Sequence, residues 1–209
     1  MANSSTLIYV HDPMCSWCWG FRPTLKHLCS LLPQSIKFER LLGGLAADND
    51  QAMPEEMQKN LQATWQRIQH KIPGTEFNFD FWRQTKPRRS TYPACRAVLT
   101  AKTLNPALED SMILAIQQAY YTRALNPSDE QILINLAGEI GLQKSDFGDM
   151  LNSPDIKQQL TQEIERSGQI GARSYPALIL KTGENSYWPV GVNYTNAQAM
   201  LETIEMLSQ

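Results

Sequence analysis

Near its N-terminus the chain reads His11-Asp12-Pro13-Met14-Cys15-Ser16-Trp17-Cys18-Trp19-Gly20-Phe21. An apolar, β-prone run at residues 7–10 precedes this stretch, and a segment with apolar side chains at helical spacing follows it to residue 32. A second apolar run, at residues 36–42, ends in a glycine pair. The order strand, helix, strand predicts a βαβ unit of a parallel sheet, with both cysteines where the first strand passes into the helix.

The spacing of these two cysteines suits disulfide chemistry. Side chains three residues apart at a helix start reach each other across one turn. Cys15 lies where unpaired backbone amides and the helix dipole stabilise a thiolate, the attacking species, so we expect it to be more reactive than Cys18. Cys18, one turn deeper, is placed to attack a mixed disulfide and release the substrate. A Cys-x-x-Cys pair at this point of a βαβ unit therefore predicts a thiol–disulfide site.

Half of a zinc site is the alternative interpretation of the pair. Such a site needs two or more further ligands, and the sequence has no second Cys-x-x-Cys and no paired histidines. The remaining candidates stand singly: Cys29, Cys95, His11, His27 and His70. We therefore predict no metal site.

We expect structural rather than chemical roles for most of these isolated side chains. Cys29 is expected to be buried packing, and Cys95, which opens a helix after a proline, to be a small buried apolar residue rather than an activated thiol. His27 and His70 are expected at the surface or in satisfied polar positions. His11 directly precedes the motif, so it either tunes the Cys15 thiolate or only ends the strand, and the sequence leaves both open.

The middle of the chain changes character. Residues 53–168 carry helix-starting chemistry and apolar periodicity at 93–102, 106–122, 128–140 and 154–167, and the run from Ser128 to Gln131 predicts a capping box. The aromatic-rich loop at 73–87 is expected to be core. Strand character returns at 177–180 and 187–190, and a helix at 194–207 closes the chain. The sequence thus predicts an α/β sheet domain that carries a helical insertion.

Composition excludes several classes of function. The net charge is −2, with both signs interspersed and no basic stripe, so a nucleic-acid binder is not expected. The N-terminal apolar run is only four residues long, so we expect neither a secretory leader nor a membrane span there. We therefore expect a cytoplasmic protein that does not bind membranes, whose four cysteines are thiols rather than structural disulfides.

The motif resembles that of the DsbA-like branch of the thioredoxin superfamily, in which a helical domain is inserted into a thioredoxin fold. The resemblance implies a thioredoxin-like domain at residues 1–52 and 169–209 and an inserted helical domain at 53–168. It implies that Cys15 is the nucleophile and Cys18 the resolving thiol. The stretch Gly171-Ala172-Arg173-Ser174-Tyr175-Pro176 matches the cis-proline loop of that branch, so Pro176 is expected to be cis and to face the cysteines.

A substrate-binding surface is expected around the pair. Tyr175 would offer its backbone to an extended substrate beside Pro176. Met14 and Trp17 would line an apolar groove together with the insertion. Trp19 is expected instead in the interface between the two domains.

The resemblance implies a protein disulfide oxidoreductase or isomerase-like enzyme that acts on protein or small-molecule disulfides. It needs a redox partner but no bound cofactor, and glutathione is a candidate for that partner. Ser16-Trp17 stands where the periplasmic oxidant has a histidine, so the direction of transfer does not carry over. The alternative is a glutathione-dependent isomerase or transferase of the 2-hydroxychromene-2-carboxylate isomerase or kappa-class type. Those enzymes typically have serine at the nucleophile position, against which Cys15 argues. A third alternative is a non-catalytic binding protein.

Overall fold

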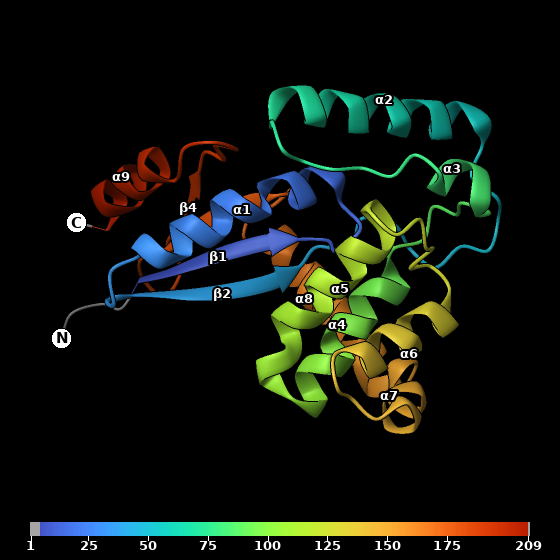
Figure 1. The fold of residues 1–209 in the computed structure, drawn as a ribbon. Helices are drawn as coiled ribbons and strands as arrows, with labels where there is room; N and C mark the ends of the chain where they lie inside the picture. The colour runs from blue at the N-terminus through green and yellow to red at the C-terminus, as the bar shows by residue number, and fades with distance from the viewer. Residues whose placement is uncertain (1–4, 209) are drawn as a thin grey trace.

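The computed structural model describes residues 5–208, and a four-stranded sheet forms the part of it that also holds the chain ends (Figure 1). The strands are β1 (Ser5–His11), β2 (Ile36–Leu42), β3 (Ala177–Lys181) and β4 (Tyr187–Val190). Their order is β2-β1-β3-β4, with β1 parallel to β2 and antiparallel to β3. Strand β1 therefore pairs with β2, the second strand of the N-terminal βαβ unit, on one side. On its other side it pairs with β3 of the C-terminal hairpin.

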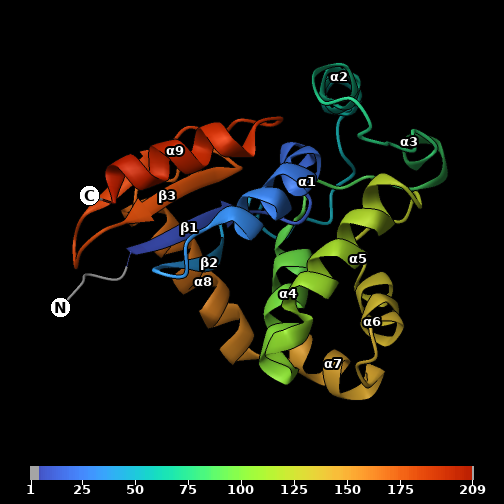
Figure 2. The same ribbon diagram turned by 60° about the vertical axis from the view of Figure 1, so that its left-hand side comes forward.

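Helices cover both faces of the sheet (Figures 1 and 2). On one face lie α1 (Ser16–Leu31) and α9 (Ala197–Leu207), and on the other lies α8 (Pro154–Gln169). Strand side chains alternate between the two faces. Leu7 and Tyr9 accordingly pack with α1 and α9, whereas Ile8 and Val10 pack with the segment that follows α8. Because both faces are buried, β1 reads as a continuous apolar run.

The remaining helices form a block beside the sheet. They are α2 (Glu55–Lys71), α3 (Phe81–Gln84), α4 (Tyr92–Leu104), the short 3₁₀ turn η1 (Pro106–Leu108), α5 (Glu109–Tyr121), α6 (Glu130–Glu139) and α7 (Lys144–Leu151). The aromatic loop packs around the buried ring of Trp65, with Phe77 stacked on it at 4.9 Å between ring centroids. The core interpretation of that loop is confirmed.

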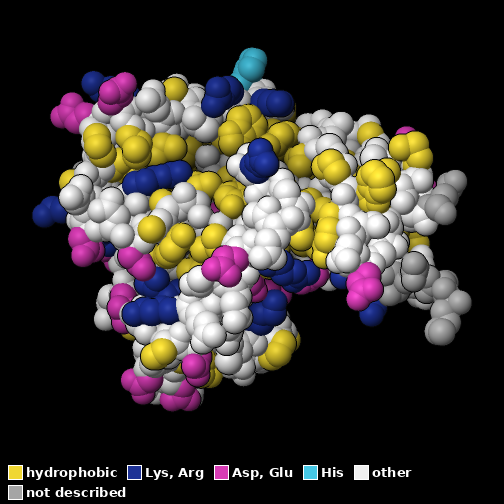
Figure 3. All heavy atoms as spheres, turned by 180° about the vertical axis from the view of Figure 1, so that it is seen from behind, with side chains coloured by type: hydrophobic (Ala, Val, Ile, Leu, Met, Phe, Trp, Pro, Cys, Tyr) yellow, Lys and Arg dark blue, Asp and Glu magenta, His cyan; other side chains and the backbone are white. Residues whose placement is uncertain are grey.

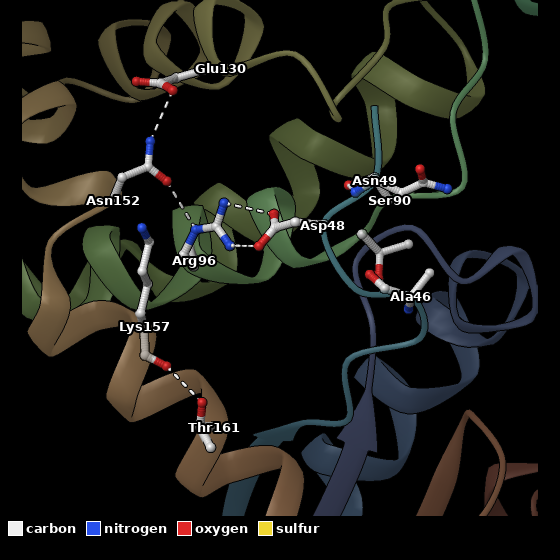
Figure 4. Close-up of polar contacts among 10 residues, drawn as sticks. Ala46, Asp48, Asn49, Ser90, Arg96, Glu130, Asn152, Lys157 and Thr161 are labelled. Carbon is white, nitrogen blue, oxygen red and sulfur yellow. Dashed lines mark hydrogen bonds and ion pairs between the residues drawn. The ribbon is translucent and has the colours of Figure 1, made fainter. Parts of the chain in front are cut away.

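Polar side chains tie the loop after β2 to this block (Figure 4). The guanidinium of the buried Arg96 on α4 donates two hydrogen bonds to the Asp48 carboxylate, at 2.8 and 2.9 Å, and one to Asn152 at 3.1 Å. Asn152 in turn donates to Glu130 at 2.9 Å. A buried charge with a bidentate partner is compensated, so this network fixes where the chain leaves β2.

The helix α8 belongs to both parts of the molecule. It packs against α4 in the block and against β2 in the sheet, where the amide of Leu42 donates to the Glu163 carboxylate at 2.7 Å. The domain boundaries at residues 53 and 168 stay a prediction, and the second of them falls near the end of this shared helix. Within residues 5–208 no helix combines the length and apolar character needed to cross a bilayer.

Two details of the sequence prediction are wrong. The run from Ser128 to Gln131 is not a capping box, because α6 begins at Glu130 and the Ser128 hydroxyl donates instead to the Ser90 carbonyl at 2.7 Å. The closing helix begins at Ala197, not at residue 194. Asn196 caps it by accepting the amide of Ala199 at 3.1 Å, and an asparagine side chain at that position favours the start of a helix.

Candidate active site

A tight turn after β1 places the first cysteine. The amide of Cys15 donates to the carbonyl of Asp12 at 3.0 Å, and the amide of Met14 donates to the Asp12 carboxylate at 2.8 Å. Cys15 has extended backbone angles and is the N-cap of α1. Its side chain therefore lies at the end of the helix where free amides concentrate positive potential, and no acidic residue occupies the first turn.

Both cysteines are free thiols, and their exposure differs in the direction that the sequence predicts. Cys15 is 6% exposed and Cys18 is 0% exposed. The Cys15 thiol donates to the carbonyl oxygen of Tyr175 at 3.5 Å, across the site. Burial, followed by the hydrogen bond and charge of Cys15, raises the pKa of the Cys18 thiol well above its ordinary value. Cys18 is thus the protected member of the pair.

The loop before β3 forms the opposite wall. The Tyr175–Pro176 peptide bond is cis, and the Tyr175 hydroxyl donates to the carbonyl of Gly43 at 2.8 Å. A Cβ at Gly43 would lie 2.1 Å from the Tyr175 ring, so only glycine leaves room for that ring. Segments following β1 and β2 and the segment preceding β3 therefore meet at Cys15.

Two aromatic side chains of β1 lie behind the pair. Burial, and then Cys18, raise the pKa of the Tyr9 hydroxyl, which is in hydrogen-bonding reach of that thiol. The imidazole of His11 stacks on Tyr9, with centroids 4.9 Å apart. Burial, with Arg40 and Arg22 nearby, lowers the pKa of His11 to about 3. A neutral imidazole brings no positive charge to a Cys15 thiolate, so the placement favours the strand-ending role.

The large apolar side chains of the motif lie in three different surroundings. Trp19 of α1 stacks on Tyr121 of α5 at 5.7 Å between ring centroids, and its indole donates to the Glu76 carbonyl at 3.0 Å. Trp17 is half-buried and packs against Tyr194, at 5.0 Å between ring centroids. Met14 is only 6% exposed and belongs to the core of the helical block, so it supports the turn from below and does not line an open groove.

The other two cysteines lie outside the motif. Cys29 is half-buried beside the α1 and α9 core, and burial raises its pKa to about 11. Cys95 is fully buried, and its thiol donates to the Asp12 carboxylate at 3.5 Å. It is therefore part of the support of the turn, beyond simple packing. Among residues 5–208, no group of three or more His, Cys, Asp and Glu side chains gathers as a metal site.

The sequence interpretation missed several residues that shape the site. The adjacent Asp12 could have been found, because an aspartate followed by a proline, three residues before the N-cap, favours a turn. Tyr9 and Tyr194 carry no local signal, since only the tertiary fold brings them near the cysteines. The same holds for Arg67 and Lys71, which only the fold brings over the Trp17 ring.

Two curated relatives are similar in sequence. They are the ClpXP adapter proteins SpxH of Halalkalibacterium halodurans and of Bacillus subtilis, each 23% identical over 172 and 171 residues, respectively. The match covers 80% of this chain in both cases, but only 56% and 55% of the relatives. The chain thus spans about half the length of the curated relatives that it matches.

Solved structures match over nearly the whole chain. A structure described as a putative protein disulfide isomerase from Nitrosomonas europaea is 25% identical, with a TM-score of 0.84 and 97% of each chain covered. The cytosolic disulfide reductase DsbM from Pseudomonas aeruginosa is 22% identical, with a TM-score of 0.77, and covers 97% of this chain and 98% of its own. The latter match shows the shared fold alone.

A family model agrees with this likeness. The model of the DSBA-like thioredoxin domain matches residues 6–201, which include both cysteines of the motif and all of the four strands except Ser5, the first residue of β1. The chain therefore belongs to the DSBA-like thioredoxin domain family.

Proposed function

We propose that this protein is a dithiol–disulfide oxidoreductase that works through Cys15 and Cys18. The observation that carries the proposal is the arrangement of two free thiols at the start of α1, one beside the Tyr175 carbonyl and the other fully buried behind it. Attack needs a thiolate that a substrate can reach, and resolution needs a second thiol that it cannot easily reach. Cys15 occupies the position that a substrate reaches first, and Cys18 occupies the protected position.

The exchange balances as two displacements. The Cys15 thiolate attacks a substrate disulfide, forming a mixed disulfide and releasing one substrate thiolate. Cys18 loses its proton to the surroundings and attacks Cys15, which closes the Cys15–Cys18 disulfide and releases the second substrate thiolate. An external dithiol or two monothiols then reduce the pair again. When Cys15 is in the mixed disulfide and no longer donates to it, the carbonyl of Tyr175 would accept the backbone amide of a peptide substrate. That is the role proposed for Tyr175 and for Pro176.

Glutathione is the monothiol we favour as the redox partner, in the cytoplasm. The support is the fold neighbour DsbM, a cytosolic disulfide reductase that has also been solved with GSH, with a TM-score of 0.74 to this chain. A glutathione-dependent isomerase or transferase is the weaker alternative, because it needs only the thiol of glutathione and leaves the buried Cys18 without a role.

Reduction of insulin disulfides by the wild type, by Cys15→Ser and by Cys18→Ser tests the proposal. Cys15→Ser should fall to the uncatalysed rate. Cys18→Ser should accumulate a mixed disulfide between Cys15 and the substrate, visible as an added mass that dithiothreitol removes. Titration of the pair in glutathione buffers gives the reduction potential and hence the direction of transfer. Full activity of Cys15→Ser would overturn the proposal.

A further inference from the structure

Two cations of α2 lie over the aromatic side chain of the motif. The guanidinium of Arg67 is 5.8 Å from the Trp17 ring centroid, and the ammonium of Lys71 is 5.5 Å from it. Lys71 also lies 5.4 Å from the ring of Tyr194, which packs against Trp17. Figure 3 shows basic side chains and a histidine gathered over the end of α2, with hydrophobic side chains directly below them.

Neither cation is neutralised within residues 5–208. The ion pairs of the described chain use seven other arginines and Lys102, whereas the guanidinium of Arg67 has only the Thr64 hydroxyl, at 3.3 Å. An exposed cation–π contact contributes about 0.5–1 kcal/mol, which positions a charge without cancelling it. Both charges therefore stay available to an anion.

The cations lie over an aromatic side chain of the cysteine motif itself. Trp17 stands between the two cysteines on the first turn of α1. Tyr194 is close enough to both that, after burial, the charges of Cys15 and Cys18 are the next causes that raise its pKa, to about 12. An anionic group held over Trp17 would therefore lie against the residue that separates the two cysteines in the chain.

A cavity adjoins this group of side chains. Its volume is about 590 Å³, and Trp19, Tyr194, Ile72, Gly74 and Thr195 are among the residues that line it. That size falls in the range of small-molecule sites. The lining also contains Arg22, which is paired with Asp110, and the single carboxylate of Glu76. The cavity therefore has room for a ligand of tripeptide size beside Tyr194, although neither the two cations nor the two cysteines line it.

We propose that Arg67 and Lys71 select small disulfides that carry carboxylates, by holding a carboxylate over Trp17 while Cys15 attacks the sulfur. This inference rests on the proposed function and adds the chemical class of substrate to it. The reaction is the same two-step thiol–disulfide exchange: the small disulfide is reduced to two thiols, and the Cys15–Cys18 pair is oxidised to a disulfide. The cations take no part in proton or electron transfer, so they act on recognition alone.

Three small disulfides test the proposal against the reduced protein: glutathione disulfide, the same compound with its carboxylates esterified, and the cationic cystamine. The rate of Cys15–Cys18 oxidation is followed in a stopped-flow instrument by the fluorescence of the nearby tryptophans. The variant is Arg67→Gln with Lys71→Gln, and the matched control is Lys59→Gln, an exposed lysine on the same helix. Thermal unfolding of all variants checks that each one folds.

The double variant should react about tenfold more slowly with glutathione disulfide, which corresponds to about 1.4 kcal/mol in the barrier. It should lose less than twofold on the ester and should react faster with cystamine. Lys59→Gln should match the wild type on all three. Equal losses on the charged and esterified disulfides, or no loss on either, would overturn the selection of carboxylates. Failure of the wild type to form the Cys15–Cys18 disulfide with any of the three would instead refute the proposed function.

Discussion

The hydroxyl of Thr91 donates to the carboxylate of Asp12 at 2.6 Å, and this bond joins the helical block to the turn that carries Cys15. The same carboxylate accepts the amides of Met14 and Leu45, at 2.8 and 2.7 Å, and is fully buried. One side chain therefore anchors the segments after β1 and β2 and the start of α4.

Replacing that anchor should loosen all three segments. Asp12→Ala leaves the buried amides of Met14 and Leu45 without acceptors, and each such loss costs about 1–3 kcal/mol. We expect the free energy of unfolding to fall by about 2–4 kcal/mol, and insulin reduction to slow, because Cys15 is no longer held by its turn. Urea unfolding measures the first effect. Asp149→Ala, at an exposed acid of α7, is the control and should change neither quantity.

The buried imidazole of His11 should make stability depend on pH. Its pKa is lowered to about 3 in the folded protein, against about 6.5 when unfolded. The stabilisation is therefore complete above pH 6.5 and is lost as the pH falls, because the unfolded chain takes up the proton first. The loss from this group at pH 5 is about 2 kcal/mol. His11→Phe keeps the stack on Tyr9 and should remove that part of the pH dependence in urea titrations at pH 7, 6 and 5. The control His27→Asn, at an exposed histidine of α1, should leave the pH dependence of stability unchanged.

Alkylation should distinguish the two thiols of the motif. Burial raises the pKa of Cys18, and its side chain is 0% exposed, whereas Cys15 reaches the surface. Iodoacetamide at neutral pH should therefore label Cys15 first, and peptide mass mapping of the reduced native protein reads this out. Cys95, buried and with a raised pKa, should remain unlabelled in the same samples. Faster labelling of Cys18 than of Cys15 would reverse their assigned roles.

The hydroxyl of Tyr9 should assist the resolving step. Its hydrogen bond lowers the pKa of Cys18 against the larger effect of burial. Tyr9→Phe removes only that oxygen, so we expect the Cys15 mixed disulfide to resolve about tenfold more slowly, since hydrogen bonds to charged groups contribute about 1.5–3 kcal/mol. Quenched-flow trapping of the mixed disulfide gives the rate. Tyr187→Phe on β4 is the matched control, and an equal slowing there would rule out a specific role.

Any side chain at Gly43 should destabilise the protein, because the Tyr175 ring fills the space beside it. Gly43→Ala places a methyl group 2.1 Å from the Tyr175 ring, so that ring and its hydrogen bond must move. We expect a loss of about 1–3 kcal/mol in stability, typical of overpacking, together with slower disulfide exchange. Gly168→Ala, in α8 with open space around the added carbon, should stabilise by about 0.5–1 kcal/mol. Chemical denaturation of both variants compares the two signs.

Local pattern was enough to predict the sheet and the cysteine pair. Strand β2 matches the predicted residues 36–42, and α1 ends one residue before the predicted boundary. Both carry a clear period of apolar side chains, and a period is a local property. The capping box failed because Ser128 is drawn to the Ser90 carbonyl, a partner 38 residues away that no local rule can find.

The site could be predicted only in part for the same reason. The chain neighbours Cys15 and Cys18 define its centre, and the family resemblance supplied Tyr175 and Pro176. Met14 was misplaced because its position in the motif says nothing about the core of the helical block beneath it. The cations over Trp17 come from α2, a helix whose packing on the site depends on the whole insertion.

The shared helix α8 connects the helical block to the sheet. Its first half packs in the helical block through Leu160, and the residues after its end pack under the sheet through Ile170. One continuous helix therefore joins the helical block to the short loop that holds Tyr175, whose carbonyl faces Cys15. A substitution that moves the block relative to the sheet should accordingly change the position of that carbonyl as well.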